Sequence, residues 1–153
     1  DLKYIAKYNE GKINGTQVSY HKNGELKRKD IFKEGEFIDG NCYTNQGKDT
    51  TFYDYIITAS FPGGEEKLFQ YLSKNVKYSQ EAKESQITGT VYVAFVVEKD
   101  GTLTNINIKR GLGGGLDEEC VNTIKNMPKW NAGFIDGEVT RSRFIMPFKF
   151  LLR

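Results

Sequence analysis

The glycine-rich run from Gly111 to Leu116 contains the residue types most suited to binding a phosphate or a cofactor. It follows a predicted strand and precedes a predicted helix, which is where phosphate-binding loops lie. The dinucleotide-binding motif, however, needs Gly-x-Gly-x-x-Gly within a parallel βαβ unit, and the strands before this run form a predicted antiparallel hairpin. The run also lacks the Lys-Ser or Lys-Thr pair of Walker loops. We therefore interpret it as a crossover loop, and we expect no cofactor and no small-molecule substrate.

The other residues with catalytic or metal-binding potential are isolated from one another. His21 is the only histidine, and no recognisable spacing joins it to further metal ligands. The carboxylate pairs Glu65-Glu66 and Glu118-Glu119 stand where helices are predicted to begin, and the helix dipole explains them there. The sequence thus provides no catalytic set and no metal site, and we predict that the protein is not an enzyme.

Composition limits the remaining classes of protein. The chain has 153 residues and a hydrophobic content of 38%, and no apolar run approaches the roughly 18 residues of a membrane-spanning helix. Its net charge of +2, with both signs interspersed, argues against a nucleic-acid-binding surface. Cys42 and Cys120 fall in separate predicted domains, so we expect two buried free thiols. These properties favour a soluble globular chain of one ordinary domain or two small ones.

The clearest pattern of secondary structure lies between residues 89 and 152. Apolar residues alternate from Val91 to Val97, as in a half-buried strand, and Asp100-Gly101 permits the tight turn of a hairpin. The apolar period becomes helical from Leu116 to Met127. A third strand then alternates from Phe144 to Phe150. This order predicts an α+β layout, with one helix against a small antiparallel sheet.

A further helix is predicted after the Pro-Gly-Gly segment that begins at Pro62. Its buried stripe should contain Leu68, Phe69, Leu72 and Val76, and one more helical turn is expected at 80–83. The predicted core is made of residues from both helices and all three strands: Leu72, Val93, Phe95, Ile108, Ile124, Trp130 and Phe148. For Trp130, which lies just after a helix end, the alternative to a core position is a binding hot spot on the surface.

Residues 61–152 resemble the C-terminal domain of TonB, the periplasmic energy-transducing protein of Gram-negative bacteria. The matching pieces occur in the family's order: Tyr78 and Ala82, Gly89, Asp100-Gly101, Leu116-Asp117, Met127-Pro128-x-Trp130, Gly133, Gly137-x-Val139 and Pro147-x-Lys149. The chain departs from the family in two loops, since Tyr78-Ser79 stands in place of Tyr-Pro and Asn131-Ala132 in place of a proline after the tryptophan. The resemblance implies an α+β fold with a small three-stranded antiparallel sheet covered by two helices.

The resemblance also implies a function. The protein would be a periplasmic module that captures the TonB box, a short segment of an outer-membrane receptor, and couples it to inner-membrane energy for transport. A membrane anchor and contact with an inner-membrane energising complex would come from segments outside this sequence. The alternative is a periplasmic envelope scaffold that keeps the TonB fold without energy transduction and binds through its N-terminal β repeats.

The third strand is the predicted binding element. Pro147 has no N–H and should lie on a sheet edge, and an unprotected edge recruits further strands. In the TonB family the corresponding strand captures its guest by β-augmentation, and the stretch containing Asn75, Lys77 and Tyr78 also touches the guest. The outward side chains of the strand are the other predicted contacts: Arg141, Arg143, Ile145 and Lys149. Two alternatives remain, namely a solvated edge that blocks aggregation and a homodimer in which the strand pairs with its own copy.

Residues 1–58 have a different sequence pattern, in which glycines recur with tyrosines between them. Gly15-x4-Tyr20-x3-Gly24 is echoed by Gly40-x2-Tyr43-x3-Gly47 about 24 residues later. Turn residues follow each tyrosine, so the pattern predicts stacked β-hairpins and is similar to MORN-type repeats. We therefore predict two domains, a MORN-like β-hairpin repeat region at 1–58 and a TonB C-terminal-like domain at 61–153.

Overall fold

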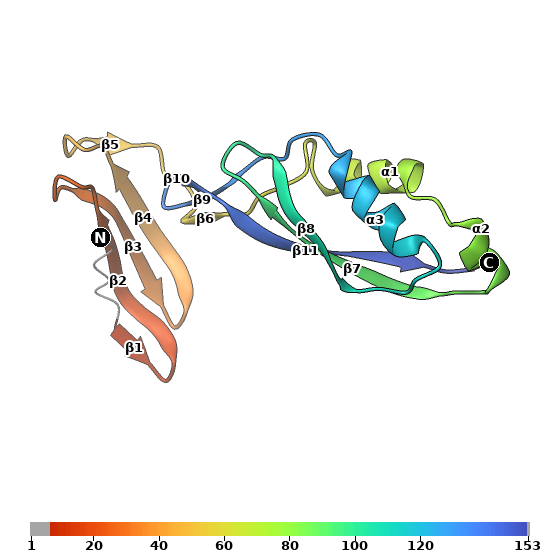
Figure 1. The fold of residues 1–153 in the computed structure, drawn as a ribbon. Helices are drawn as coiled ribbons and strands as arrows, with labels where there is room; N and C mark the ends of the chain where they lie inside the picture. The colour runs from red at the N-terminus through yellow and green to blue at the C-terminus, as the bar shows by residue number, and fades with distance from the viewer. Residues whose placement is uncertain (1–6, 153) are drawn as a thin grey trace. The chain divides into compact units, whose positions relative to one another are not determined.

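The computed structural model describes residues 7–152, and the chain forms two compact units, one ending at Asp54 and one beginning at Tyr55 (Figure 1). The first unit contains β1 (Lys7–Asn9), β2 (Lys12–Tyr20), β3 (Leu26–Lys33), β4 (Glu36–Tyr43) and β5 (Asp49–Thr50). The second contains β6 (Ile56–Ile57), α1 (Glu65–Asn75), α2 (Gln80–Glu84), β7 (Gly89–Val97), β8 (Leu103–Arg110), α3 (Leu116–Lys125), β9 (Gly133–Ile135), β10 (Glu138–Thr140) and β11 (Ser142–Phe150). These antiparallel sheets and three helices confirm the predicted α+β class.

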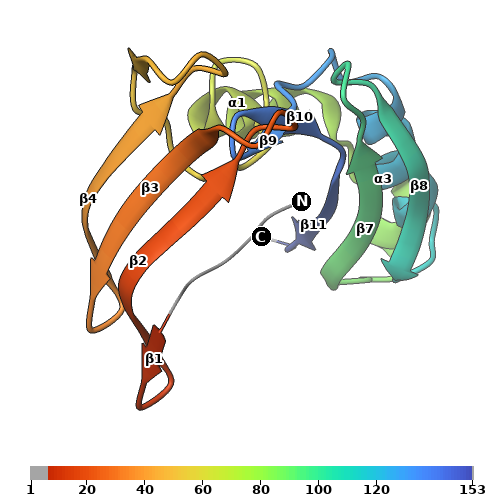
Figure 2. The same cartoon turned by 90° about the vertical axis from the view of Figure 1, so that its left-hand side faces the viewer.

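The first unit is one antiparallel sheet in which β1 to β5 follow each other in chain order (Figure 2). Its turns repeat. Gly24 N–H donates to His21 O at 2.9 Å, and Gly47 N–H donates to Thr44 O at 3.0 Å. The two turns are also bonded to each other, because the His21 ring bonds to Tyr43 O and the Asn23 amide donates to Asn45 O, both at 2.8 Å. Gly24 and Gly47 therefore belong to two equivalent turns that are bonded to each other.

An ion pair occupies one face of the first unit's sheet. Arg28 and Asp30 are both almost fully buried, with 2.5 Å between Nε and Oδ2. The Arg28 guanidinium also donates to Tyr53 O at 2.7 Å and lies 4.9 Å from the centre of the Phe52 ring. A buried charge is tolerated only when it is paired and hydrogen-bonded, which explains why these polar residues lie inside so small a sheet. A side chain at Gly40 would come within 2.5 Å of Asp30 Oδ1, so the pair also requires glycine there.

The main sheet of the second unit has the strand order β11-β7-β8, and Figures 1 and 2 show the helices on one of its faces. The alternating residues of β7 from Val91 to Val97 turn toward the helices and are fully buried. The buried side chains of α3 meet them there: Leu116, Cys120 and Ile124. β7 therefore forms the centre of the core because it has a partner strand on each edge and helices over one face.

Trp130 lies in the core, 4% exposed, and its ring contacts aromatic rings from three other segments. The ring centres are 6.0 Å from Phe61, 5.4 Å from Phe95 and 5.2 Å from Phe144, all near edge-to-face. This geometry is the favoured one for aromatic pairs. The core position predicted for Trp130 is therefore correct, and the alternative of a surface hot spot is not.

The hairpin turn between β7 and β8 packs against the backbone of Trp130. Gly101 has a φ of +85°, as the Asp-Gly turn predicts, and its carbonyl accepts from Trp130 N–H at 2.9 Å. A Cβ at this position would lie 2.1 Å from Trp130 O. Glycine is needed here for its left-handed conformation and also for the close approach of two backbones.

Three local features differ from the sequence-based expectation. Ile56 and Ile57, expected in the first domain, form β6 and pair with β9 of the second unit. The predicted single last strand is divided at Arg141 into β10 and β11. Phe69 is 61% exposed rather than buried, because it lies one residue from the inward stripe of Leu68 and Leu72, about 100° around the helix.

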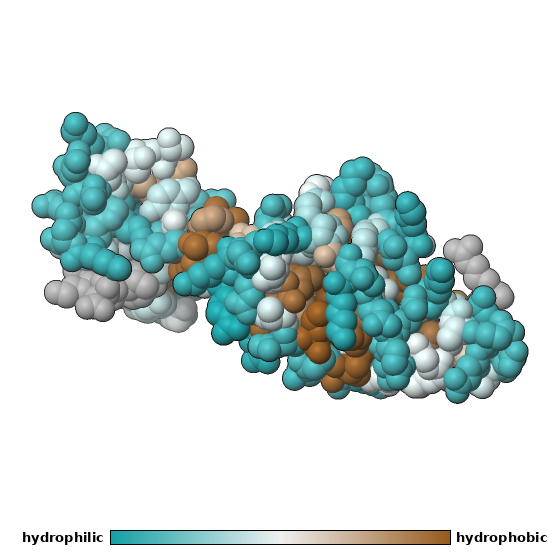
Figure 3. Space-filling model, turned by 45° about the horizontal axis from the view of Figure 1, so that its top comes forward, coloured by the Kyte–Doolittle hydropathy of each residue, from teal (hydrophilic) through white to brown (hydrophobic). Residues whose placement is uncertain are grey.

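A second small sheet in this unit has the order β10-β9-β6, and its surface is apolar. The exposed residues are Ile56, Ile57, Phe134, Ile135 and Val139. Figure 3 shows this surface in brown where the three strands lie. Within residues 7–152, no helix combines the length and the apolar character that crossing a membrane requires.

Replacing Trp130 by alanine should lower the free energy of unfolding by roughly 3–5 kcal/mol, because it empties the centre of the aromatic cluster. Urea denaturation of the purified protein measures the loss. Phe69→Ala is the matched control, since it removes an exposed aromatic ring from the same unit and should cost less than about 1 kcal/mol. Equal losses in the two variants would contradict the central role of Trp130.

Gly101→Ala should destabilise the protein more than Gly113→Ala, although both glycines have positive φ values of 85° and 75°. Nothing lies within 4 Å of a Cβ at Gly113, so that variant carries only the backbone strain of about 1–2 kcal/mol. The Gly101 variant must in addition separate the turn from Trp130, which adds roughly 1–3 kcal/mol. Thermal unfolding of the two variants measures the difference, and equal melting temperatures would show that the turn does not need this close approach.

Candidate functional site

The free edge of β11 is the main surface feature of the second unit. β11 pairs with β7 over nine residues, from Ser142 opposite Val97 to Phe150 opposite Gly89, without a register shift. Within the described part of the chain, no strand pairs with its other edge. Alternate N–H and C=O groups on that side are therefore open to a further strand.

The side chains of β11 alternate between the core and the opposite face. Phe144, Met146, Phe148 and Phe150 face the helices, and the last three are buried. The predicted contact residues Arg143, Ile145 and Lys149 are exposed on the other face, with Ile145 57% exposed. Pro147 lies among them, so the strand presents one position without an N–H.

A groove of about 400 Å³ lies beside the C-terminal half of β11. Its lining comes from α1, the segment that follows α1 and the end of β11: Phe69, Leu72, Ser73, Val76, Tyr78 and 147–151. Most of these side chains are apolar, as is usual for a site that receives side chains of a peptide. Sequence analysis missed Phe69 and Leu151 as lining residues. Both are large apolar side chains that the structure leaves exposed, and no pattern in the sequence indicates this exposure.

The predicted contact residues after α1 are held in place by hydrogen bonds. The Asn75 amide donates to Tyr71 O at 2.8 Å, and Lys77 N–H donates to Glu119 Oε1 at 3.0 Å. The Tyr78 hydroxyl donates to Ile87 O, and its ring lies edge-on to Phe150 at 5.4 Å. The structure thus brings Tyr78 and Lys149 together in the groove, whereas the Asn75 and Lys77 side chains do not line it.

Arg141 lies between β10 and β11, and its side chain is engaged within the protein. Its Nε and Nη2 donate to the two carboxylate oxygens of Glu98, at 3.1 Å and 3.0 Å. Thr104 Oγ1 donates to the same carboxylate at 2.6 Å. The Arg141 hydrogen bond, followed by that of Thr104, lowers the pKa of Glu98 below its ordinary value of 4.5. A partner would therefore have to compete with Glu98 for this arginine.

Hydrogen bonds hold two loops in place: the glycine run that begins at Gly111, and the turn at Ser79, where the family has the proline of its Tyr-Pro pair. Asp117 accepts from the N–H groups of Leu112 and Gly113, at 2.8 Å and 3.3 Å, so the glycine run binds its own helix's carboxylate. Ser79, in the position after Tyr78, caps α2 by accepting from Ala82 N–H at 3.0 Å. Its hydroxyl also donates to Gly114 O, which joins the two loops.

Helices on one face of a small sheet, with an edge strand beside an apolar groove, form an arrangement that suits a protein-interaction domain. A family model described as the Gram-negative bacterial TonB protein C-terminal matches residues 74–152, just over half of the 153 residues. The chain belongs to this TonB C-terminal family. The family consists of periplasmic protein-interaction domains, not enzymes, and it generally binds TonB-dependent receptors of the outer membrane. Comparisons with curated proteins and with solved structures found no match.

Arg141→Gln should raise the pKa of Glu98 toward its ordinary value, because the guanidinium that stabilises the carboxylate is lost. The folded-state pKa of Glu98 lies below the unfolded one. Its interaction therefore adds stability above the unfolded pKa, and this contribution disappears as the pH falls through the folded pKa. NMR titration of the Glu98 carboxyl carbon measures both proteins, and an unchanged pKa in the variant would contradict the pairing.

Proposed function

We propose that the protein captures a short extended segment of an outer-membrane receptor, the TonB box, by adding it as a fourth strand beside β11. In the full-length protein, anchored in the inner membrane, this capture couples the receptor to the energy of an inner-membrane complex for transport. The observation that carries the proposal is the free edge of β11 over nine residues. Strand addition uses backbone hydrogen bonds for affinity and side-chain pockets for selectivity.

Pro147 indicates which backbone groups would bond to the guest. A proline within a sheet is tolerated where its nitrogen faces away from the neighbouring strand. Pro147 then directs its nitrogen to the free edge, and residues in phase with it direct their N–H groups the same way. The donors available to a guest strand are those of Arg143, Ile145 and Lys149, with a one-residue interruption at Pro147.

The side chains around this edge would select the guest. One set of guest side chains would enter the apolar groove next to Tyr78 and Phe69, and the other set would lie beside the exposed Arg143, Ile145 and Lys149. Asn75 and Lys77 are exposed next to the groove-lining Val76 and Tyr78, so they would reach the guest from outside the groove. Arg141 would contact the guest only where the guest displaces Glu98 from its guanidinium.

The N-terminal unit supports a second candidate function. Its two equivalent turns are bonded to each other through His21 and Asn23, as expected for stacked repeats of a MORN-like kind. An array of such hairpins would serve as a periplasmic envelope scaffold, and the second unit would then keep the TonB fold without transducing energy. Under either function the repeat region predicted at 1–58 would be carried by the first unit, which ends at Asp54, and the TonB C-terminal-like domain predicted at 61–153 by the second.

Ile145→Pro tests the proposed edge. The substitution is in phase with Pro147, so the ladder to β7 should survive while a central donor for the guest is lost. The loss of this hydrogen bond and the clash of the ring with a guest strand should weaken binding of a TonB-box peptide about tenfold or more. NMR titration of the protein with the peptide measures the affinity and locates the contact.

The matched control is Ile145→Ala, which removes the side chain but keeps the N–H. It should weaken binding only a few-fold, because the backbone carries most of the affinity. Chemical-shift changes confined to residues 7–54, with no change in the signals of β11, would favour the scaffold function. Light scattering without peptide tests the competing homodimer, in which the same edge pairs with a second copy.

A further inference from the structure

We propose that the open face of the second unit's sheet holds a binding site for a carboxylate group, in a pocket over β7 between Arg143 and the asparagines of β8. The pocket has a volume of about 250 Å³. Its lining comes from all three strands and the residue before β11: 94–96, Asn105, Asn107 and 141–143. It uses side chains on the face of the sheet, whereas the proposed strand capture uses the backbone edge of β11, and Arg143 borders both sites.

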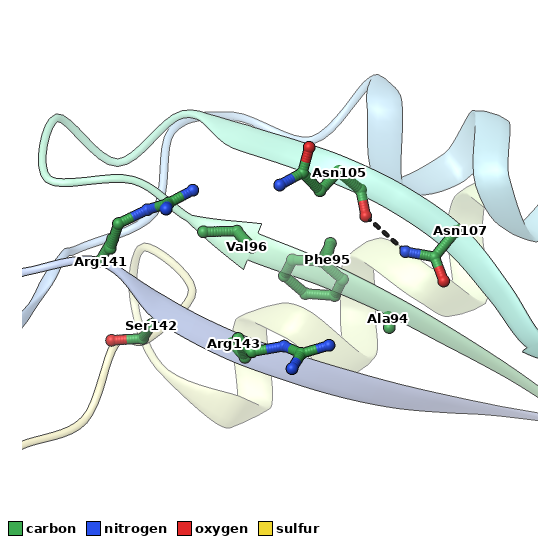
Figure 4. A pocket seen from close by; sticks show the side chains of 8 residues that line it. All are labelled: Ala94, Phe95, Val96, Asn105, Asn107, Arg141, Ser142 and Arg143. Atoms are coloured by element: carbon green, nitrogen blue, oxygen red, sulfur yellow. Dashed lines mark hydrogen bonds between the residues drawn. The ribbon is translucent and has the colours of Figure 1, made fainter.

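The floor of the pocket consists of small apolar side chains. Ala94 and Val96 alternate with the core residues of β7, so they point away from the helices. They are nevertheless only 5% and 8% exposed. Long polar side chains from the two flanking strands stand on either side of them (Figure 4). The site thus has a largely buried apolar floor and an exposed polar rim, a combination usual for sites that bind small ligands.

The sheet register fixes the width of the site. Arg143 lies opposite Val96 on one side of β7, and Asn107 lies opposite Ala94 on the other. Neighbouring strands are about 4.8 Å apart, so residues on β11 and β8 stand about 10 Å apart across β7. A group the size of a carboxylate fits between side chains that reach inward from these two strands.

A bulge in β8 brings a second amide to this site. The register of β7 and β8 shifts between Ala94 and Val96, and Asn105 there has a φ of +51°. The Asn107 amide donates to Asn105 O at 2.7 Å, and this hydrogen bond stabilises the bulge. Figure 4 shows the Asn105 side chain reaching toward Arg141 from the opposite side of β7. Bulges commonly redirect a side chain in this way, and here the redirected group is a hydrogen-bond donor.

Charge at the rim selects a monoanion. Arg141 is neutralised by Glu98, whereas Arg143 has no ion-pair partner within residues 7–152. Two guanidinium groups and one carboxylate leave a single net positive charge. A carboxylate matches that charge and the fork of donors on Arg143, and the asparagine amides can donate to its remaining lone pairs. A phosphate dianion would leave one negative charge uncompensated at this site.

Titration of the ¹⁵N-labelled 153-residue protein with N-acetylalanine tests the proposal. We expect saturable shifts of the side-chain amide signals of Asn105 and Asn107 and of Arg143 Nε. N-acetylalaninamide, which has nearly the same shape but no charge, should produce none. Arg143→Gln should weaken binding roughly tenfold, since it removes a charge-assisted hydrogen bond. Asn107→Ala should weaken it too, and because Asn107 lies on β8, outside the proposed peptide contacts, this variant should bind the TonB-box peptide as the unsubstituted protein does.

Arg110→Gln is the matched control, because Arg110 is an exposed arginine on β8 that does not line the pocket. It should leave the affinity for N-acetylalanine unchanged. Two peptides then identify the natural source of the carboxylate. One has a free C-terminus, and the other is amidated and carries an internal aspartate; binding of either supports the site.

Four results would overturn the proposal. They are the absence of saturable shifts with N-acetylalanine, equal binding of the neutral amide, equal losses in Arg143→Gln and Arg110→Gln, and tighter binding of inorganic phosphate than of the carboxylate. The first would mean that the site binds no carboxylate. The second and third would mean that the pocket does not recognise the charge specifically, and the fourth that the ligand class is wrong.

Discussion

The contact between Trp130 and the Gly101 turn sets the geometry of the second unit. Trp130 N–H donates to Gly101 O, and the two backbones approach so closely that no side chain fits at Gly101. This fixes the β7–β8 hairpin to the segment after α3. The Trp130 ring simultaneously packs on rings from β7, β11 and the segment before α1. One residue thus holds both layers of the domain together, so the position of the sheet relative to the helices depends on it.

The helices cover one face of the main sheet and leave its other face open, and within residues 7–152 no strand pairs with the outer edge of β11. The edge offers unpaired backbone groups beside an apolar groove, which suits an extended peptide. The open face offers polar side chains around Ala94 and Val96, which suits a small anionic group. The same strand therefore serves two surfaces with different chemistry, and Arg143 lies where they adjoin. In the first unit the sheet instead contains a buried ion pair between Arg28 and Asp30.

Prediction from the sequence succeeded where the pattern was long and failed where it was short. The alternation of apolar residues from Val91 to Val97 was recognisable because it repeats one preference along the strand, and the Asp100-Gly101 turn because its residues favour a tight hairpin. The strands β6, β9 and β10 have two or three residues each, too few to show a period. Phe69 was misplaced because a helix stripe is judged to within about one residue, whereas one residue moves a side chain by about 100°. No local pattern around Arg141 indicates that Glu98, 43 residues away, binds it.

The sequence by itself determined the α+β class, the apolar faces of the main strands and helices, the hairpin turn and the place of Pro147. These depend on local preferences and on periods that neighbouring residues share. Only the tertiary structure decided which groups lie together: the groove between α1 and β11, the pairing of Arg141 with Glu98 next to Arg143, and the asparagines across β7 from these arginines. These arrangements bring together residues up to about 80 positions apart along the chain, such as Phe69 and Leu151, which line the same groove. Local preference carries no information about them, because the packing of the whole core fixes their distances.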